Sequence, residues 1–439
     1  MNIRKMALCF LIPFITTLCS CQARELSPQG EQLWQKKIVP AYSPNTKALH
    51  VSYTLPLIHD SLIILPEIAD QQTTLTAYQL ENGKQQWQTG INGRVEIFDK
   101  KLLVLGTYPY QHEYFLLNTE NGQTLWKQSL RSIFEQQSTR YMFIHDLLFV
   151  YTSSNASNSL FPIVPTLVAL SSEDGRIVYQ KSFEGETSFE LGQLDEANAY
   201  LLFDKKLSWM NISSGTITQE FELSSLLELD PYMSHYADNN AIYLASAEGI
   251  QAIDANNGQY LWNRQGTLKV DDTADTITLA SPEILFVNDD FGILYFYHNS
   301  SILSFDHKSG AILWERKVVN KKSVCVYFAP FDNSRIPLLL YQDESKHLLA
   351  IHGQTNELIW RSDKKVLLDT LVSVVDETCI LFDQLQQSIM GMETSSGKVL
   401  FQIPASPPHP EYPHFRFHDQ NFCYIDIDGV FRVISLKVP

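Results

Sequence analysis

The sequence lacks several residue patterns that mark particular enzyme classes. It contains no Gly-x-Ser-x-Gly nucleophile elbow and no phosphate-binding loop, so neither a serine hydrolase nor a P-loop nucleotidase is indicated. It has no adjacent cysteine pair and no Cys-x-x-Cys pair, which argues against a redox or zinc role. We therefore assign no catalytic residue, no cofactor-binding residue and no metal ligand, and we expect a protein that is not an enzyme and has no cofactor.

Positive charge is also scarce. The chain of 439 residues has 33 Lys and Arg against 49 Asp and Glu, a formal net charge of -16. Nucleic-acid binding needs a basic face, so we expect no nucleic-acid partner. The same balance opposes adsorption to anionic lipid by charge alone.

Cysteine usage gives no sign of a disulfide framework. Three of the six cysteines lie at or before residue 21, and the others are Cys325, Cys379 and Cys423. Each of these three lies in an apolar, strand-like run, which favours buried thiols. A bridge between Cys379 and Cys423 is left open.

Long hydrophobic runs are missing except at the N-terminus. Arg4 and Lys5 precede an apolar run over 6–18 that is too short to span a membrane as a helix. The run ends in Leu18-Cys19-Ser20-Cys21, which resembles the cleavage box of bacterial lipoproteins. The resemblance implies a signal peptide at 1–20, lipidation of Cys21 and a lipidated tether at 21–29. An ordinary secretory signal with an incidental cysteine is the alternative.

The rest of the chain is organised by a repeat. A glycine is followed four residues later by a large ring, at intervals of about 40–50 residues, a period typical of propeller blades. The pairs are Gly83 with Trp87, Gly122 with Trp126, Gly175 with Tyr179, Gly258 with Trp262, Gly310 with Trp314, and Gly397 with Phe401. Asn356 replaces the glycine before Trp360, and Gly215 has Gln219 in place of the ring.

Each copy has a physical interpretation. A polar residue four before the glycine, such as Asn118 or Asp306, can hydrogen-bond the backbone of the turn. The glycine supplies the positive φ of a tight hairpin, and asparagine is the next best choice. We expect the ring to lie on the outgoing strand and to fill the seam between two blades.

The two ends of the chain carry complementary halves of one copy. Gly30 and Trp34 have the second half only, whereas the strand-like runs 421–427 and 430–437 lack an outgoing strand. We expect an all-β fold at 30–439. It is a single β-propeller of eight four-stranded antiparallel blades, with nine as the alternative, closed by pairing the N-terminal strand with the C-terminal blade.

Three irregular segments are candidate contact sites because functional loops are carried by rigid scaffolds. They are the polar loop 153–165, the acidic stretch 270–276 and the proline-rich segment 404–413. His409, Glu411, His414 and His418 lie in or just after the last one, and we interpret them as surface residues. Asp426 and Asp428 alternate with isoleucines, which predicts the solvent face of a strand.

The frame of small residue, polar residue, glycine and tryptophan resembles the quinoprotein-type (PQQ-like) propeller repeat. Combined with the cleavage box before Cys21, it is similar to the outer-membrane protein assembly factor family, the propeller lipoproteins of the barrel-assembly machinery. The resemblance implies a non-enzymatic lipoprotein on the periplasmic side of the outer membrane, whose partner is a barrel-assembly complex. Gln22, which is not the aspartate of inner-membrane retention, favours the outer membrane.

Two other functions are kept as alternatives. One is a propeller lipoprotein that serves as the scaffold of another envelope complex. The other is a quinone-dependent dehydrogenase, which would need a cofactor clamp and a bound calcium ion. The missing cysteine pair and the shorter chain disfavour the enzyme.

Overall fold

The computed structural model describes most of the chain after residue 29. The described ranges are 30–37, 57–69, 72–91, 93–98, 101–106, 112–134, 139–152, 164–203, 206–223, 234–237, 241–246, 249–265, 267–269, 276–278, 283–288, 293–298, 301–318, 324–331, 334–366, 373–375, 377–407, 416–418, 421–426, 428 and 430–436. Within them the regular structure is β-strand, apart from the short helix α2 (Arg131–Phe134). The all-β class predicted from the sequence is confirmed.

The strands form nine four-stranded antiparallel sheets among the described residues, numbered here in chain order. Sheet 1 contains β2 (Leu57–His59), β3 (Leu62–Ala69), β4 (Gln72–Gln79) and β5 (Gln85–Thr89); sheet 2 contains β6 (Gly93–Phe98), β7 (Lys101–Gly106), β8 (Glu113–Asn118) and β9 (Thr124–Ser129). Sheet 3 contains β10 (Thr139–Ile144), β11 (Leu147–Thr152), β12 (Thr166–Ser171) and β13 (Ile177–Ser182); sheet 4 contains β14 (Glu190–Gln193), β15 (Asn198–Leu202), β16 (Lys206–Asn211) and β17 (Ile217–Glu222).

The second half of the chain continues the pattern. Sheet 5 contains β18 (Ser234–Ala237), β19 (Ala241–Ser246), β20 (Gly249–Asp254) and β21 (Tyr260–Gln265); sheet 6 contains β24 (Glu283–Asn288), β25 (Ile293–His298), β26 (Ser301–Asp306) and β27 (Ile312–Lys317). Sheet 7 contains β28 (Val324–Phe331), β29 (Ser334–Gln342), β30 (Leu348–His352) and β31 (Leu358–Arg361); sheet 8 contains β32 (Ser373–Val375), β33 (Thr378–Asp383), β34 (Ser388–Glu393) and β35 (Val399–Pro404). Sheet 9 contains β36 (Arg416–His418), β37 (Asn421–Ile425), β38 (Val430–Leu436) and β1 (Gly30–Lys37).

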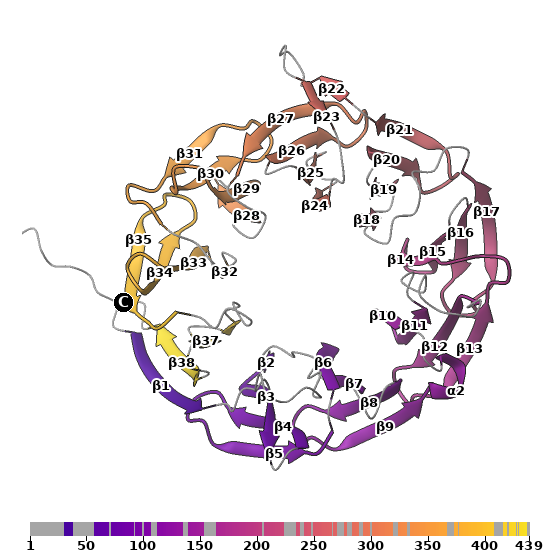
Figure 1. The fold of residues 1–439 in the computed structure, drawn as a ribbon, viewed down its shortest axis with the longest axis horizontal. Coiled ribbons are helices and arrows are strands. Elements are labelled where there is room, and N and C mark those ends of the chain that lie inside the picture. Colours follow the sequence, from indigo (N-terminus) through magenta and orange to yellow (C-terminus); the bar gives the residue numbers. More distant parts are fainter. Residues whose placement is uncertain are drawn as a thin grey trace, which may run out of the picture.

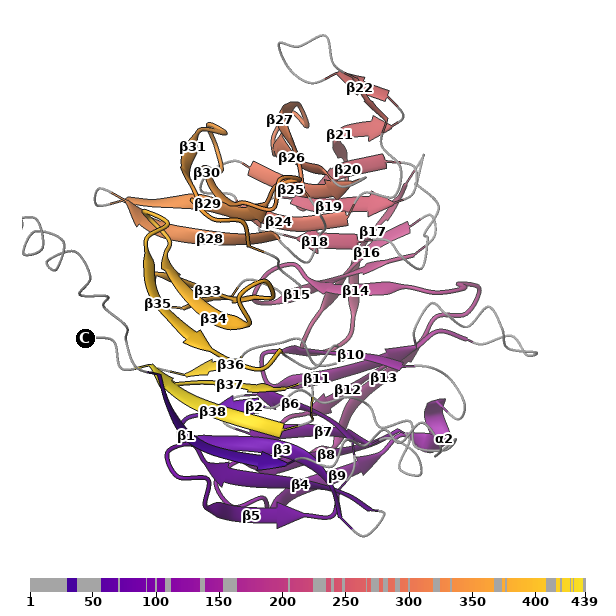
Figure 2. The same cartoon turned by 60° about the vertical axis from the view of Figure 1, so that its left-hand side comes forward.

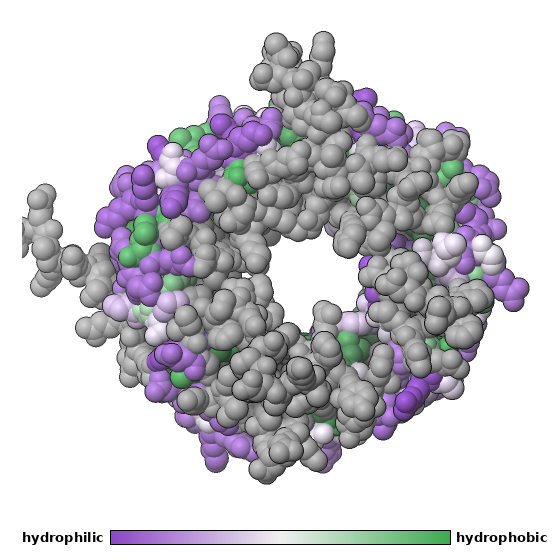
Figure 3. All heavy atoms as spheres, viewed as in Figure 1, coloured by the Kyte–Doolittle hydropathy of each residue, from purple (hydrophilic) through white to green (hydrophobic). Residues whose placement is uncertain are grey.

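The sheets stand around a central opening as the blades of a propeller (Figure 1). The first strand of each sheet borders the opening and the last strand lies at the outer rim, and the turned view shows neighbouring sheets facing each other (Figure 2). The space-filling view shows the same opening (Figure 3). A two-stranded ribbon, β22 (Thr267–Lys269) and β23 (Thr276–Thr278), projects outward between sheets 5 and 6.

Sheet 9 joins the two ends of the chain. Strand β1 pairs antiparallel with β38, from Gly30 opposite Leu436 to Lys37 opposite Val430. The predicted pairing of the N-terminal strand with the C-terminal sheet is therefore present. It gives the last sheet the outgoing strand that the C-terminal sequence lacks.

A β-bulge interrupts the outermost strand of every sheet. In sheet 2, Trp126 pairs with Leu116 and Thr124 pairs with Leu117, which leaves Leu125 between them without a partner. Trp126 is 7% exposed and Leu125 is 48% exposed. The extra residue thus turns the ring into the seam and sends its neighbour to solvent. The other bulges occur at the corresponding positions.

The hydrophobic core is divided among the seams. One cluster, for example, joins Tyr243 and Trp262 of sheet 5 to Leu303 and Phe305 of sheet 6. Another joins Leu338 and Trp360 of sheet 7 to Leu381 and Met392 of sheet 8. Each sheet is therefore stabilised mainly by its two neighbours, as in other repeat architectures.

Candidate functional site

The predicted repeat residues meet in pairs across the seams. The ring on the last strand of one sheet packs against the turn glycine of the following sheet. A Cβ atom added at Gly310 would lie 2.5 Å from the Trp262 ring. The same close approach joins Trp34 to Gly83, Trp87 to Gly122, Trp126 to Gly175, Tyr179 to Gly215, and Trp360 to Gly397.

Each of these rings also donates a hydrogen bond to the same backbone group. The acceptor is the carbonyl three residues before the turn glycine, or before Asn356 in sheet 7. The bonds run from Trp34 to Leu80 (2.7 Å), Trp87 to Thr119 (2.8 Å), Trp126 to Ser172 (3.1 Å), Tyr179 to Ile212 (2.7 Å), Trp262 to His307 (2.7 Å), Trp314 to Gly353 (3.0 Å) and Trp360 to Thr394 (2.6 Å). The ring therefore fixes both the distance and the register between neighbouring sheets.

The turns have the geometry that the sequence predicted. Gly310 has φ +64° and Asn356 has φ +61°, so asparagine does adopt the left-handed conformation in place of glycine. Asn118 Oδ1 accepts from the Glu120 N–H at 2.7 Å, and Asp306 Oδ1 accepts from the Ser309 N–H at 2.7 Å.

A second contact crosses some of the seams two residues after the ring. Arg264 donates to the carbonyls of Gly310 (2.9 Å) and Ser309 (2.7 Å), and Arg316 donates to the Asn356 carbonyl (3.1 Å). Lys181 reaches the Gly215 carbonyl at 3.2 Å. A long cationic side chain at this position therefore bridges to the next turn.

Two seams depart from the pattern. Between sheets 4 and 5 the ring comes from Phe221, since a Cβ at Gly258 would lie 2.3 Å from Phe221. Phe221 does not fit the repeat pattern of the sequence, because it lies six residues after Gly215 and not four. Between sheets 8 and 9 the ring is Phe401, which lies in a cluster with Phe422 and Tyr424. The glycine that Phe401 contacts is Gly391, its pairing partner within sheet 8, and not a turn glycine of the next sheet.

A polar network joins the strands next to the central opening. Arg140 of β10 bonds Glu190 of β14, with an Nη1–Oε1 distance of 2.6 Å. The His235 ring of β18 lies 3.6 Å from Glu190 Oε2, and its Nδ1 is 2.6 Å from the Tyr200 hydroxyl. Glu190 is buried. Nearby, burial raises the pKa of the Tyr151 hydroxyl to about 12, so this phenol stays protonated at neutral pH. Three successive sheets are thus tied together at their inner edges.

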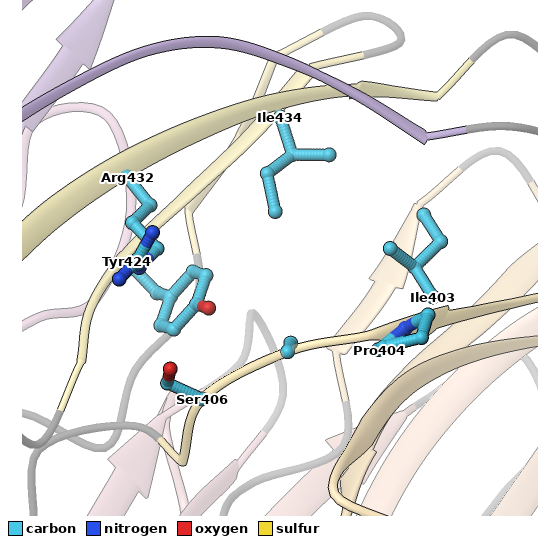
Figure 4. A pocket seen from close by; sticks show the side chains of 7 residues that line it. Ile403, Pro404, Ser406, Tyr424, Arg432 and Ile434 are labelled. Atoms are coloured by element: carbon cyan, nitrogen blue, oxygen red, sulfur yellow. The ribbon is translucent and has the colours of Figure 1, made fainter.

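A pocket of about 220 Å³ lies in the seam between sheets 8 and 9 (Figure 4). Its lining residues are Ile403, Pro404, Ala405, Ser406, Tyr424, Arg432 and Ile434. The two isoleucines lie at one end, and the Tyr424 and Ser406 hydroxyls lie at the other. It is a second candidate site, which the sequence did not indicate.

Asp426 corrects one prediction. The alternating pattern placed it on a solvent face, but its side chain is fully buried and accepts from Arg432 Nε at 2.6 Å. It also accepts from the backbone N–H groups of Asp428 (3.0 Å) and Val430 (2.9 Å). The carboxylate therefore organises the β37–β38 turn from inside, and only Asp428 is exposed.

Several predicted residues lie outside the described part of the chain. These are Cys21, the loop 153–163, the acidic stretch 270–275 and the segment 408–415, with His409, Glu411 and His414. Cys379 and Cys423 are buried in two different clusters. The described ranges contain no group of three or more His, Cys, Asp or Glu that could hold a metal ion. In the same ranges, no helix has the length and apolar character needed to cross a membrane.

Comparison with protein families finds one match. Residues 115–326 match the family model described as outer membrane protein assembly factor BamB. The resemblance of the repeat to this family is thereby confirmed over sheets 2 to 6. No curated protein matches the sequence.

Three solved structures illustrate what the chain is similar to. BamB from Moraxella catarrhalis is 13% identical, with a TM-score of 0.46 over 93% of this chain and 98% of that one. Quinohemoprotein alcohol dehydrogenase from Comamonas testosteroni is 11% identical, with a TM-score of 0.45 over 88% and 74%. Citrobacter koseri AztD is 8% identical, with a TM-score of 0.44 over 76% and 92%. No functional statement follows from these three likenesses.

The ring contact at the turn glycine can be tested at Gly310. We expect Gly310→Ala to lower the free energy of unfolding by about 3 kcal/mol, through left-handed strain and the clash with Trp262. Gly185→Ala is the matched control, because Gly185 has φ +86° but no atom within 4 Å of the added Cβ; it should cost about 1 kcal/mol. Urea unfolding measures both. Equal costs would show that the ring contact contributes nothing.

The inner network can be tested at Glu190. Glu190→Gln should lower the free energy of unfolding by about 2–3 kcal/mol, because it removes charge-assisted hydrogen bonds from Arg140 at a buried position. Glu186→Gln is the control: this residue pairs with Lys206 at 3.0 Å nearer the surface, and its loss should cost less than about 1 kcal/mol. A larger loss from the control in thermal or urea unfolding would contradict this assignment.

Proposed function

We propose that this chain is a closed nine-bladed propeller that acts as a lipid-anchored scaffold for other proteins in the assembly of outer-membrane β-barrels. The observation that carries the proposal is the match of residues 115–326 to the BamB family model. In this proposal residues 1–20 are the signal peptide, Cys21 carries the lipid and 21–29 are the tether. The propeller then faces the periplasm from the outer membrane.

The use of the described side chains supports a binding role over catalysis. The repeat rings and the cations that follow them bond turns of neighbouring sheets, and Glu190 accepts from Arg140 and lies 3.6 Å from the His235 ring. These polar groups hold the sheets in place. A rigid ring with variable loops is well suited to present contact surfaces to protein partners.

The outer rim gives a further indication of how partners are met. The exposed residues at the bulges include Leu125, Leu261 and Leu313, which are spread over separate sheets. In the space-filling view, hydrophobic surface at the rim is scattered among hydrophilic surface (Figure 3). Isolated apolar residues are ordinary on soluble surfaces, so we place partner binding at loops and not along the rim strands.

A quinone-dependent dehydrogenase is the competing function. It would carry a bound quinone with its own absorbance, whereas a scaffold would purify without one. The second alternative is a scaffold of another envelope complex. This function differs from the proposed one only in the identity of the protein partner.

The partner is tested by crosslinking. The tagged full-length protein is crosslinked in cells, purified from detergent-solubilised envelopes and analysed by mass spectrometry. We expect enrichment of an outer-membrane barrel protein that carries periplasmic repeat domains, relative to an unrelated tagged lipoprotein. Enrichment of a different complex would favour the second alternative, and a stoichiometric quinone absorbance would favour the enzyme.

The anchor is tested separately at Cys21. We expect Cys21→Ala to move the protein from the membrane fraction to the soluble fraction, because multiple acyl chains are what hold a lipoprotein durably in a membrane. Cys9→Ala, in the apolar part of the proposed signal, is the matched control and should stay with membranes. The attached lipid is followed by incorporation of a labelled fatty acid, because an uncleaved apolar run at 6–18 also holds a chain at membranes. Equal incorporation by the Cys21 variant and the wild type would refute the lipid anchor and leave the propeller unaffected.

A further inference from the structure

The seam between sheets 8 and 9 is built differently from the others. In seven of the nine seams a tryptophan or tyrosine donates to a turn carbonyl of the next sheet. Here the ring is Phe401, which has no donor. The next sheet offers no continuous turn either, because its last two strands, β38 and β1, come from opposite ends of the chain.

The residue two positions after the ring also differs. It is Lys36, Lys181, Arg264 or Arg316 in four other seams, where the long side chain crosses to the next sheet. Here it is Ile403, which is too short and too apolar to do so. The seam therefore lacks the donor-bearing ring, the long side chain and the turn. The seam between sheets 4 and 5, with Phe221 and Leu223, lacks the first two but keeps the turn at Gly258.

The adjacent seam, between sheets 9 and 1, shows which side-chain contact is missing between sheets 8 and 9. Across the seam from sheet 9 to sheet 1, the Lys36 ammonium lies 4.2 Å from the centre of the Tyr78 ring. Strand register makes Ile434 the counterpart of Tyr78. Trp34 pairs with Val433, which Ile434 follows, and Trp87 pairs with Ala77, which Tyr78 follows. Ile403 and Ile434 thus face each other where Lys36 and Tyr78 would be in contact, and the pocket lies between them (Figure 4).

The lining defines the chemistry of an occupant. Ile403, Pro404 and Ile434 make apolar walls, and the hydroxyls of Tyr424 and Ser406 mark a polar end. Arg432 borders the pocket, but its Nε already donates to buried Asp426 at 2.6 Å. This pair is neutral overall, so the pocket has little preference for a charged ligand of either sign. A hydroxyl oxygen can accept a hydrogen bond from an uncharged donor.

We propose that this pocket binds a planar, uncharged aromatic group that carries one N–H donor, of which indole is the simplest example. Such a group supplies the aromatic ring that Tyr78 supplies at the corresponding place in the adjacent seam. Its ring lies between Ile403 and Ile434, and its N–H points to the hydroxyl end of the pocket. Burial raises the pKa of Tyr424 to about 12, so that hydroxyl remains a neutral phenol across the physiological range. The source of the group is either a free aromatic molecule or a tryptophan side chain of a protein partner.

The test uses indole as the probe and the full-length protein in detergent. Saturation-transfer NMR and calorimetry should show saturable binding of millimolar indole to the wild type. Ile403→Lys restores the residue type found at Lys36 and fills the pocket, so it should weaken binding at least about tenfold, which corresponds to about 1.4 kcal/mol. Thr89→Lys is the matched control: Thr89 also lies two residues after a ring, Trp87, but in the seam of sheets 1 and 2, and this variant should bind as the wild type does.

Ser406→Tyr fills the pocket from its opposite end and keeps the test valid if Ile403→Lys does not fold. Ser406 lies after the end of β35, where the backbone is not part of a sheet. Undiminished indole binding by a folded pocket-filling variant, or no binding by the wild type at millimolar indole, would overturn the proposal. Competition by N-acetyltryptophanamide would indicate a tryptophan side chain as the natural occupant, whereas binding of indole alone would indicate a free aromatic molecule.

Discussion

The contact between an aromatic ring and the turn glycine of the next sheet sets the spacing between neighbouring sheets. An indole face leaves no room for a Cβ atom at Gly122, Gly175 or Gly310, and its N–H reaches a carbonyl of the same turn. Within the described ranges neighbouring sheets share no backbone ladder, so side-chain contacts of this kind set how closely and in what register they approach. The bulge before each ring serves the contact, because strict alternation along the outer strand would not aim the ring into the seam.

The inner and outer edges of the sheets meet different physical demands. At the outer rim, the last strand of each sheet has an unpaired edge, and the bulge there makes a poor template for another strand. Near the opening, the first strands of sheets 3, 4 and 5 converge and are joined by Arg140, Glu190 and His235. Aromatic side chains therefore connect the sheets at the periphery, and in sheets 3 to 5 polar side chains also connect them near the centre.

Sequence patterns predicted the parts of this structure that depend on local geometry. The left-handed turn at Asn356, the polar residue before it and the ring after it all lie within ten residues, so one pattern reveals them. Phe221 was missed because a ring can reach the same turn from a different position on the strand. The bond between Arg140 and Glu190 spans fifty residues, and nothing local distinguishes these residues from surface charges. Asp426 alternates like an exposed residue, and only the position of Arg432 reveals why it is buried.

The pairing of β1 with β38 has a consequence for the order in which the protein can fold. The two strands are almost four hundred residues apart in the sequence. Closing a loop of this length costs entropy before the contact stabilises anything, so we expect sheet 9 to form last. Until it forms, β1 and β38 each present a strand edge without its partner, and the folding chain is then most exposed to pairing with another chain.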